Sequence, residues 1–134
     1  MPEIQQVIAD TSVLIAFEKL KLLNLLCHVY DQILLPSAVH HEYSSDSKPC
    51  FTMAEAPQGV SKLLENEIGL GRGESEAIAL AFTSDVPVLI DDLKGRKAAR
   101  TLGCRISGTI GVLVKMERWG FGKNGTPKAD FKCL

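Results

Sequence analysis

The stretch Val86-Pro87-Val88-Leu89-Ile90-Asp91-Asp92 decides the fold that this sequence predicts. Residues 86–90 are apolar throughout and rich in β-branched side chains, which is typical of a strand buried on both faces. The acidic pair Asp91-Asp92 follows directly and marks the end of that strand. A strand covered on both faces needs a layer of helices on each side, so the stretch predicts a central strand of a parallel sheet.

Short apolar strands and amphipathic helices alternate along the rest of the chain. We expect further strands at Gln5–Ala9, Gln32–Leu35 and Cys104–Ser107. We expect a helix from Ser12 to about Leu26 and a second from Pro36-Ser37, with Ser37 as N-cap, through Glu42 or Tyr43. Further helices are expected around Gly59–Asn66 and at Glu74–Thr83, Lys94–Leu102 and Thr109–Trp119. The polar stretch Ser44–Thr52 and the connector Gly69–Gly73 are expected to be loops, and the tail from Gly120 to be irregular. This alternation predicts a three-layer α/β/α fold around a parallel sheet.

Length and charge narrow the classes of protein that remain. The chain has 134 residues and a formal net charge of −1, which fits one domain without an overall basic excess. Contact with a nucleic acid would therefore need a local basic patch or a metal ion. No apolar run is long enough to span a membrane, and the N-terminus lacks a basic signal-peptide region, so we expect a cytoplasmic protein.

The cysteines give no pattern of a metal site or of a disulfide framework. Cys27, Cys50, Cys104 and Cys133 contain no C-x-x-C pair and have no histidine at zinc-finger spacing. We expect them to be thiols in a reducing compartment.

Acidic residues follow two of the predicted strands. Asp10 comes directly after the first strand, and Asp91-Asp92 after the third. In an open parallel sheet, ligands bind beyond the carboxyl ends of the strands, so these acids should share one edge. Carboxylates gathered there repel one another unless a cation lies between them, and Mg²⁺ prefers oxygen ligands of this kind. The alternative is that each aspartate only caps the helix that follows it.

Two glutamates join this set. Glu74 begins an alanine-rich helix and lies on its buried face, at the tip that reaches the sheet edge. Glu76 lies about 200° round the same helix, so we expect it to be solvated. Glu42 ends a short helix, where the helix dipole disfavours an acid, so it either serves a site or is simply solvated.

Other candidate features carry less weight. Gly69-x-Gly71-x-Gly73 lacks the G-x-G-x-x-G spacing of a dinucleotide loop and is interpreted as a hinge. His41, beside Glu42, is a possible general base, but we expect it on the surface.

The ordered set of motifs resembles the PIN-domain superfamily over residues 5 to about 119. The matching pieces are the strand before Asp10-Thr11-Ser12, Pro36-Ser37-x-Val39-x-x-Glu42, Gly73-Glu74, Leu89-Ile90-Asp91-Asp92 with Arg96 and Ala99, and Gly108-Thr109-Ile110-Gly111. The chain is similar to the nucleic-acid-binding branch that resembles toxin subunits of bacterial and archaeal toxin–antitoxin pairs.

The resemblance implies a Mg²⁺- or Mn²⁺-dependent endoribonuclease. Its catalytic residues would be Asp10, Glu42, Glu74, Asp91 and Asp92, with Asp10, Glu74 and Asp92 holding the metal. RNA contacts are expected from Ser12 and Thr109 and from the basic side chains Lys94, Arg96, Lys97 and Arg100. The implied partners are single-stranded RNA, an antitoxin protein and a second copy of the chain, in a prokaryotic cell.

The sequence departs from the family pattern in two places. Ser107-Gly108-Thr109 stands where many members carry a last acid, which puts a second metal in doubt. A glycine-rich tail replaces a further helix, which puts dimer contacts and substrate shape in doubt.

Two other classes of protein remain open. One is a receiver-like, Mg²⁺-binding phospho-switch, although its acid pair should follow the first strand. The other is a catalytically silent PIN-like interaction module.

Overall fold

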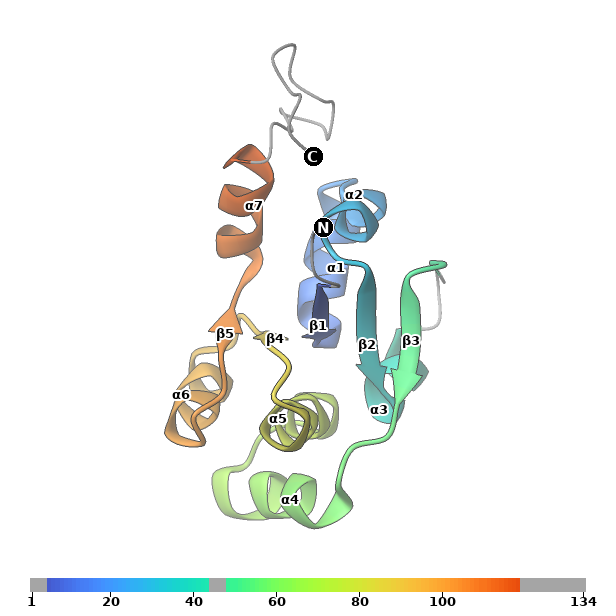
Figure 1. Ribbon diagram of the computed structural model, residues 1–134. Coiled ribbons are helices and arrows are strands. Elements are labelled where there is room, and N and C mark those ends of the chain that lie inside the picture. Colours follow the sequence, from blue (N-terminus) through green and yellow to red (C-terminus); the bar gives the residue numbers. More distant parts are fainter. Residues whose placement is uncertain (1–4, 44–47, 119–134) are drawn as a thin grey trace.

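The computed structural model describes residues 5–43 and 48–118 (Figure 1). Within these ranges one sheet has five parallel strands in the order β3-β2-β1-β4-β5. The strands are β1 (Gln6–Ala9), β2 (Gln32–Pro36), β3 (Phe51–Ala54), β4 (Val88–Leu89) and β5 (Ile106–Ser107). The helices are α1 (Thr11–Lys19), α2 (Leu23–Val29), α3 (Ser37–Glu42), α4 (Gln58–Leu63), the π-helix η1 (Leu64–Ile68), α5 (Arg72–Ser84), α6 (Leu93–Thr101) and α7 (Thr109–Arg118). The predictions for Trp119 and for the tail from Gly120 lie outside the described residues.

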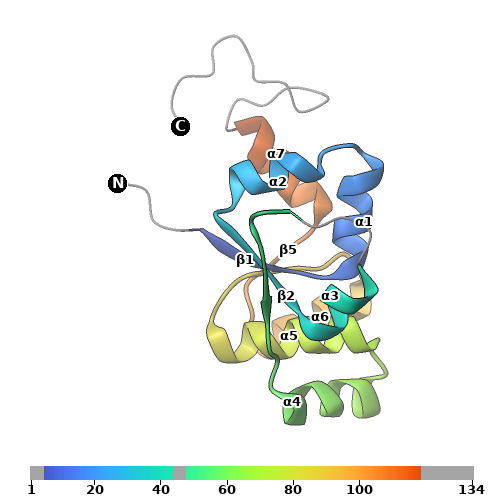
Figure 2. The same cartoon turned by 90° about the vertical axis from the view of Figure 1, so that its right-hand side faces the viewer.

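Helices cover both faces of the sheet, as predicted. Helices α1, α2 and α7 lie on one face, and α4, α5 and α6 lie on the other (Figure 2). Alternate residues of β1 separate the two cores: Val7 and Ala9 pack with α1, α2 and α7, whereas Ile8 packs with α5 and α6. The three-layer α/β/α fold is therefore confirmed.

The strand order fixes where ligands can approach. The chain winds outward from β1 through β2 to β3, then returns to place β4 on the other side of β1. The carboxyl ends of β1 and β4 thus flank the point where the winding reverses, which is where open α/β sheets bind ligands. Receiver domains use the order 2-1-3-4-5, so the receiver-like alternative is wrong.

The helix predicted from Ser12 to Leu26 is in fact two helices. Lys21 adopts a left-handed conformation (φ 59°) between α1 and α2, and the turn lets Leu23, Leu25 and Leu26 return to the core. No glycine or proline marks the break, and both helices supply apolar residues, so the spacing looked continuous. Among the residues described, no helix is long and apolar enough to cross a membrane.

A strand and a disulfide occur where the sequence predicted a loop and free thiols. Strand β3 begins at Phe51 and pairs in parallel with β2 at the edge of the sheet. This pairing brings Cys50 beside α2, where its sulfur is bonded to that of Cys27, with Cα atoms 5.6 Å apart. The prediction of reduced thiols is therefore wrong for this pair. The cysteines are separated by 23 residues in the chain, and only the sheet brings them together.

Candidate functional site

A groove of about 530 Å³ opens at the carboxyl ends of β1 and β4. It is lined by residues from α1, α3, the connector before α5, and the starts of α5 and α6. The predicted site residues in this lining are Asp10, Ser12, Glu42, Glu74, Asp92 and Lys94. The structure therefore brings four of the five predicted catalytic acids to one groove.

Asp10 and Asp92 each cap a helix while lining the groove. Asp10 follows β1 and is almost fully buried, and its carboxylate accepts hydrogen bonds from Thr11 N (2.9 Å) and Ser12 Oγ (3.0 Å). Asp92 caps α6 by accepting from Gly95 N at 2.9 Å. Burial raises the pKa of Asp10, the two hydrogen bonds oppose that rise, and the charges of Glu42 and Asp92 add to it. Asp10 and Asp92 thus each do both things: they cap a helix and they line the acidic groove.

Glu42 is the last residue of α3, and its side chain lines the groove. Its Oε1 accepts a hydrogen bond from Thr11 Oγ1 at 3.2 Å. The same oxygen lies over Gly73, at the place where any larger residue would put its Cβ. Gly73 therefore leaves the space that the Glu42 carboxylate occupies.

Glu74 is the most strongly perturbed acid of the groove. Burial first, and then the charges of Asp10 and Asp92, raise its pKa to about 7, while the charge of Lys94 opposes that rise. Its carboxyl group packs against Gly95, where an added Cβ would lie 2.8 Å from Cδ. The groove thus holds carboxylates in a state of mutual repulsion that a cation would relieve.

The donors of the groove are chemically suited to a hard divalent cation. Asp10, Glu42, Glu74 and Asp92 offer only carboxylate oxygens, the ligand type that Mg²⁺ and Mn²⁺ prefer. Among residues 5–43 and 48–118, however, no three acidic, histidine or cysteine side chains are grouped closely enough to hold an ion as they stand. Binding would require these side chains to move closer together, and attraction to the cation would drive that movement.

Asp91, the fifth predicted acid, does not line the groove. Its carboxylate accepts from Thr109 N (2.8 Å) and Thr109 Oγ1 (2.6 Å), which ties it to the start of α7. The hydrogen bond of Arg96 favours a structural role over RNA binding, because its Nη1 donates to the carbonyl oxygen of Ile90 at 2.9 Å. Asp91, Arg96 and Thr109 therefore join β4, α6 and α7 beside the groove.

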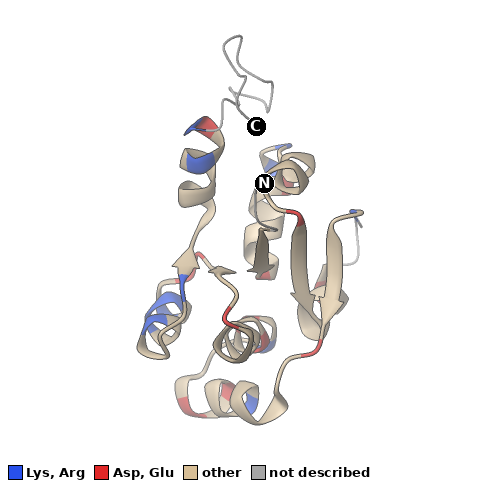
Figure 3. Cartoon of the chain, in the orientation of Figure 1, with Lys and Arg blue, Asp and Glu red and all other residues tan. Residues whose placement is uncertain are grey.

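The remaining predicted RNA contacts lie on α6. Lys and Arg residues gather on this helix (Figure 3). Lys94, Lys97 and Arg100 are exposed. Lys94 lines the groove itself, whereas Lys97 and Arg100 lie farther along the helix. A basic face thus begins at the acidic groove and leads away from it.

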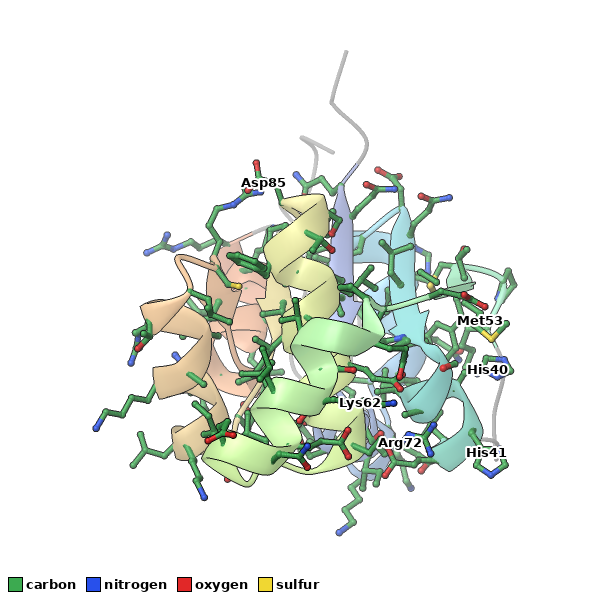
Figure 4. The ribbon with its side chains drawn as sticks, turned by 90° about the horizontal axis from the view of Figure 1, so that it is seen from below. His40, His41, Met53, Lys62, Arg72 and Asp85 are labelled. Atoms are coloured by element: carbon green, nitrogen blue, oxygen red, sulfur yellow. A yellow bond between two sulfur atoms is a disulfide. The ribbon has the colours of Figure 1, made fainter. Side chains whose placement is uncertain are left out.

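Glu76 contradicts its prediction. It is 1% exposed, and its Oε1 accepts hydrogen bonds from Ser37 Oγ and Ala38 N at the start of α3. The helical wheel placed Glu76 away from Glu74 correctly, but α3 packs against that side of α5. Ser37, predicted to cap α3, is instead its first residue and donates to Glu76. His41 is exposed on α3, as expected (Figure 4).

Three groove features escaped the sequence reasoning. Thr11 binds Glu42, Gly73 leaves room for Glu42, and Gly95 leaves room for Glu74. Gly73 directly precedes Glu74, and Gly95 directly follows Lys94, so both lie at predicted helix starts. Nothing in the sequence around either glycine indicates which side chain would pack against it.

A second cavity of about 490 Å³ lies at the opposite, amino-terminal edge of the sheet. Its lining includes Gln5, Tyr30, Arg105 and Lys115, with Asp85 as its acid. Because that lining holds no cluster of carboxylates, the acidic groove is the candidate site.

Comparison with known proteins agrees with this arrangement. A family model described as a PIN domain matches residues 6–128. No curated protein matches the chain. The match spans every described strand and helix and includes all of the groove's acids. The chain therefore belongs to the PIN-domain family.

Proposed function

We propose that the protein is a Mg²⁺- or Mn²⁺-dependent endoribonuclease that cleaves single-stranded RNA. PIN domains are generally metal-dependent nucleases. The observation that carries the proposal is the convergence of Asp10, Glu42, Glu74 and Asp92 on one groove at the reversal point of the sheet. Burial, and after it the charges of the neighbouring acids, raises the pKa values of Asp10 and Glu74, and a bound cation would offset the repulsion between these charges.

The residues of the groove would divide the work of the proposed reaction between holding the metal and contacting the RNA. Asp10, Glu74 and Asp92 would hold the metal, which, when bound, would supply an acidified water and neutralise charge on the phosphoryl group. Hydrolysis adds this water across the phosphodiester, so its hydroxyl would end on phosphorus and its proton on the leaving ribose oxygen. Ser12 keeps the Asp10 carboxylate oriented through its hydrogen bond. Lys94, which lines the groove, would contact a backbone phosphate.

The proposal is tested by measuring Mn²⁺ binding and RNA cleavage in wild type, Asp10→Asn and Asp92→Asn. Asn is as good an N-cap as Asp, and the Ser12 hydroxyl can turn to accept from the new amide, so both variants should fold. We expect each to lose Mn²⁺ affinity by calorimetry and cleavage of a fluorescent single-stranded RNA. Unchanged metal affinity in both variants would refute the nuclease site.

The same experiment separates a nuclease from a silent PIN-like module. A silent module would bind RNA without cleaving it at any Mn²⁺ concentration, and Asp10→Asn would change neither result. Cleavage that requires Mn²⁺ and is lost in Asp10→Asn excludes that alternative.

We further propose that the protein is the toxin of a toxin–antitoxin pair. The support is the family resemblance together with an acidic groove that suits insertion of an Arg or Lys from a small antitoxin protein. Expression of wild type alone should slow growth, whereas Asp10→Asn should not, and a cognate antitoxin encoded by a neighbouring gene should restore growth. If wild type and Asp10→Asn are equally harmless, the toxin role fails and a ribonuclease with another cellular role remains.

A further inference from the structure

Helix α3, whose last residue is Glu42, is too short to be stable without contacts to the rest of the protein. It has six residues, and isolated helices of that length are not stable in water. Pro36 precedes it and contributes no side-chain cap, so its first N–H groups need a partner from elsewhere. The placement of Glu42 therefore depends on what holds α3 against the rest of the protein.

Glu76 of α5 supplies that partner. Its Oε1 accepts from Ala38 N at 3.0 Å and from Ser37 Oγ at 3.2 Å, both in the first turn of α3. The carboxylate is 1% exposed, and a buried charge of this kind makes strong hydrogen bonds. A negative group at a helix N-terminus is also favoured by the helix dipole.

The other carboxylate oxygen of Glu76, Oε2, is also buried in the protein. It lies there without a hydrogen bond from the described residues, and the exposed Arg72 approaches it with Nε at 3.6 Å. Arg72 belongs to the first turn of α5, four residues before Glu76 (Figure 4). Burying this carboxylate costs desolvation free energy, and the exposed Arg72 offsets only part of that cost. The buried acid therefore needs a structural or functional reason for its position.

The two ends of α3 are thus fixed by the same helix. At one end Glu76 binds Ser37 and Ala38, and at the other Gly73 leaves the space in which Glu42 lies. Val39, between them, is fully buried and also packs close to Gly73.

We propose that Glu76 is a positioning residue that caps α3 from α5 and thereby sets Glu42 in the acidic groove. Glu74 and Glu76 would then serve one site in two ways, since Glu74 faces the groove and Glu76 orients another of its acids. The part of this inference that concerns metal binding rests on the proposed function.

The first test measures amide hydrogen exchange of residues 37–42 in the metal-free protein. Glu76→Ala leaves the Ala38 amide without its acceptor, so exchange of α3 should quicken by roughly tenfold or more. Glu76→Gln keeps an oxygen acceptor and should restore most of the protection. Glu18→Ala, an exposed helical glutamate on α1, is the matched control and should leave α3 unchanged. Unchanged exchange of α3 in Glu76→Ala would overturn the proposal.

The second test asks whether Glu76 acts through Glu42. Glu42 lines the groove and adds a carboxylate charge beside Asp10, so it should strengthen Mn²⁺ binding without itself holding the ion. Glu76→Ala should therefore weaken Mn²⁺ binding about tenfold in wild type but have little effect in a Glu42→Gln background, because the charge it positions is already gone. Equal losses in both backgrounds would mean that Glu76 acts by another route and would overturn the proposal.

Two further outcomes are decisive. If Glu76→Ala does not fold, Ser37→Ala removes one of the two donors, and α3 exchange should still quicken about threefold. No change in Ser37→Ala would then overturn the positioning role. If wild type binds no Mn²⁺, the proposed nuclease function fails, while the exchange result still decides whether Glu76 holds α3.

Discussion

The carboxyl group of Glu74 rests against Gly95, so closely that a Cβ at position 95 would lie 2.8 Å from its Cδ. Gly95 is in the first turn of α6, and its N–H also binds the Asp92 carboxylate. One glycine therefore serves two groove acids, one through its backbone N–H and one by the absence of a side chain.

Gly95→Ala should impair the acidic groove without lowering the stability of the fold. The methyl group would displace the Glu74 carboxyl, which ends a flexible side chain, and would keep the N–H that caps Asp92. Alanine in a helix is favoured over glycine by roughly 0.5–1 kcal/mol, so the melting temperature should hold or rise. Mn²⁺ affinity and RNA cleavage should fall. Calorimetry and thermal melts on the same sample check this, and a variant with full activity would contradict the placement of Glu74.

Glu74→Gln should change the pH dependence of stability in metal-free protein. The folded-state pKa of Glu74 is raised from 4.5 to about 7. Below pH 4.5 the group is protonated in both states and costs nothing. Between pH 4.5 and about 7 the group ionises in the unfolded chain but keeps its proton in the fold, where burial and neighbouring charge oppose ionisation, so wild type loses stability over this range and the loss is complete above about pH 7. Melts in chelator should show Glu74→Gln more stable than wild type at pH 8, with the difference vanishing near pH 4.5.

Neighbouring aspartates 91 and 92 should behave in opposite ways. Asp91 binds Thr109 at the start of α7, so Asp91→Ala should lower the free energy of unfolding by about 1 kcal/mol. Its Mn²⁺ affinity should stay near that of wild type. Asp92→Asn should keep stability and lose metal. Urea unfolding and Mn²⁺ titration distinguish them, and metal loss in Asp91→Ala would move that residue into the site.

The basic face of α6 should contribute to RNA binding through charge alone. Replacing both Lys97 and Arg100 with alanine should lower the slope of log affinity against log salt by up to about 1.4, at roughly 0.7 per contact with a single strand. Arg96→Ala should instead destabilise the fold, because it removes the bond to the Ile90 carbonyl. Fluorescence anisotropy over a salt series, using uncleavable RNA, gives these slopes. An unchanged slope would exclude Lys97 and Arg100 from the interface.

Reduction of the Cys27–Cys50 disulfide should destabilise the protein. The bridge closes a loop of 23 residues, which corresponds to about 3 kcal/mol of lost chain entropy in the unfolded state. Chemical unfolding with and without reductant should show that difference in wild type and none in Cys27→Ser. Mass spectrometry of alkylated protein reports whether the bond is present. Equal stability under both conditions would show that the pair has no structural part.

Much of the fold and the acidic set could be predicted from the sequence, because the signals are local. The apolar run before Asp91-Asp92 indicates a buried strand wherever it lies in the chain. Alternation of strands and helices then places acids that follow strands at one edge of a parallel sheet. Asp10 and Asp92 were predicted in this way, and Glu74 was predicted from its place at the start of an alanine-rich helix; all three line the groove.

Only the tertiary structure decided which acids face the groove and what supports them. Asp91 and Asp92 are adjacent in sequence, yet one binds Thr109, 18 residues away, and the other caps its own helix. Glu76 was expected in solvent, because a helical period gives a direction but not the neighbour that fills it. That neighbour is α3, whose Ala38 lies 38 residues from Glu76 along the chain. Burial, hydrogen-bond partners and the Cys27–Cys50 bond all depend on contacts between distant segments, and no local pattern encodes those contacts.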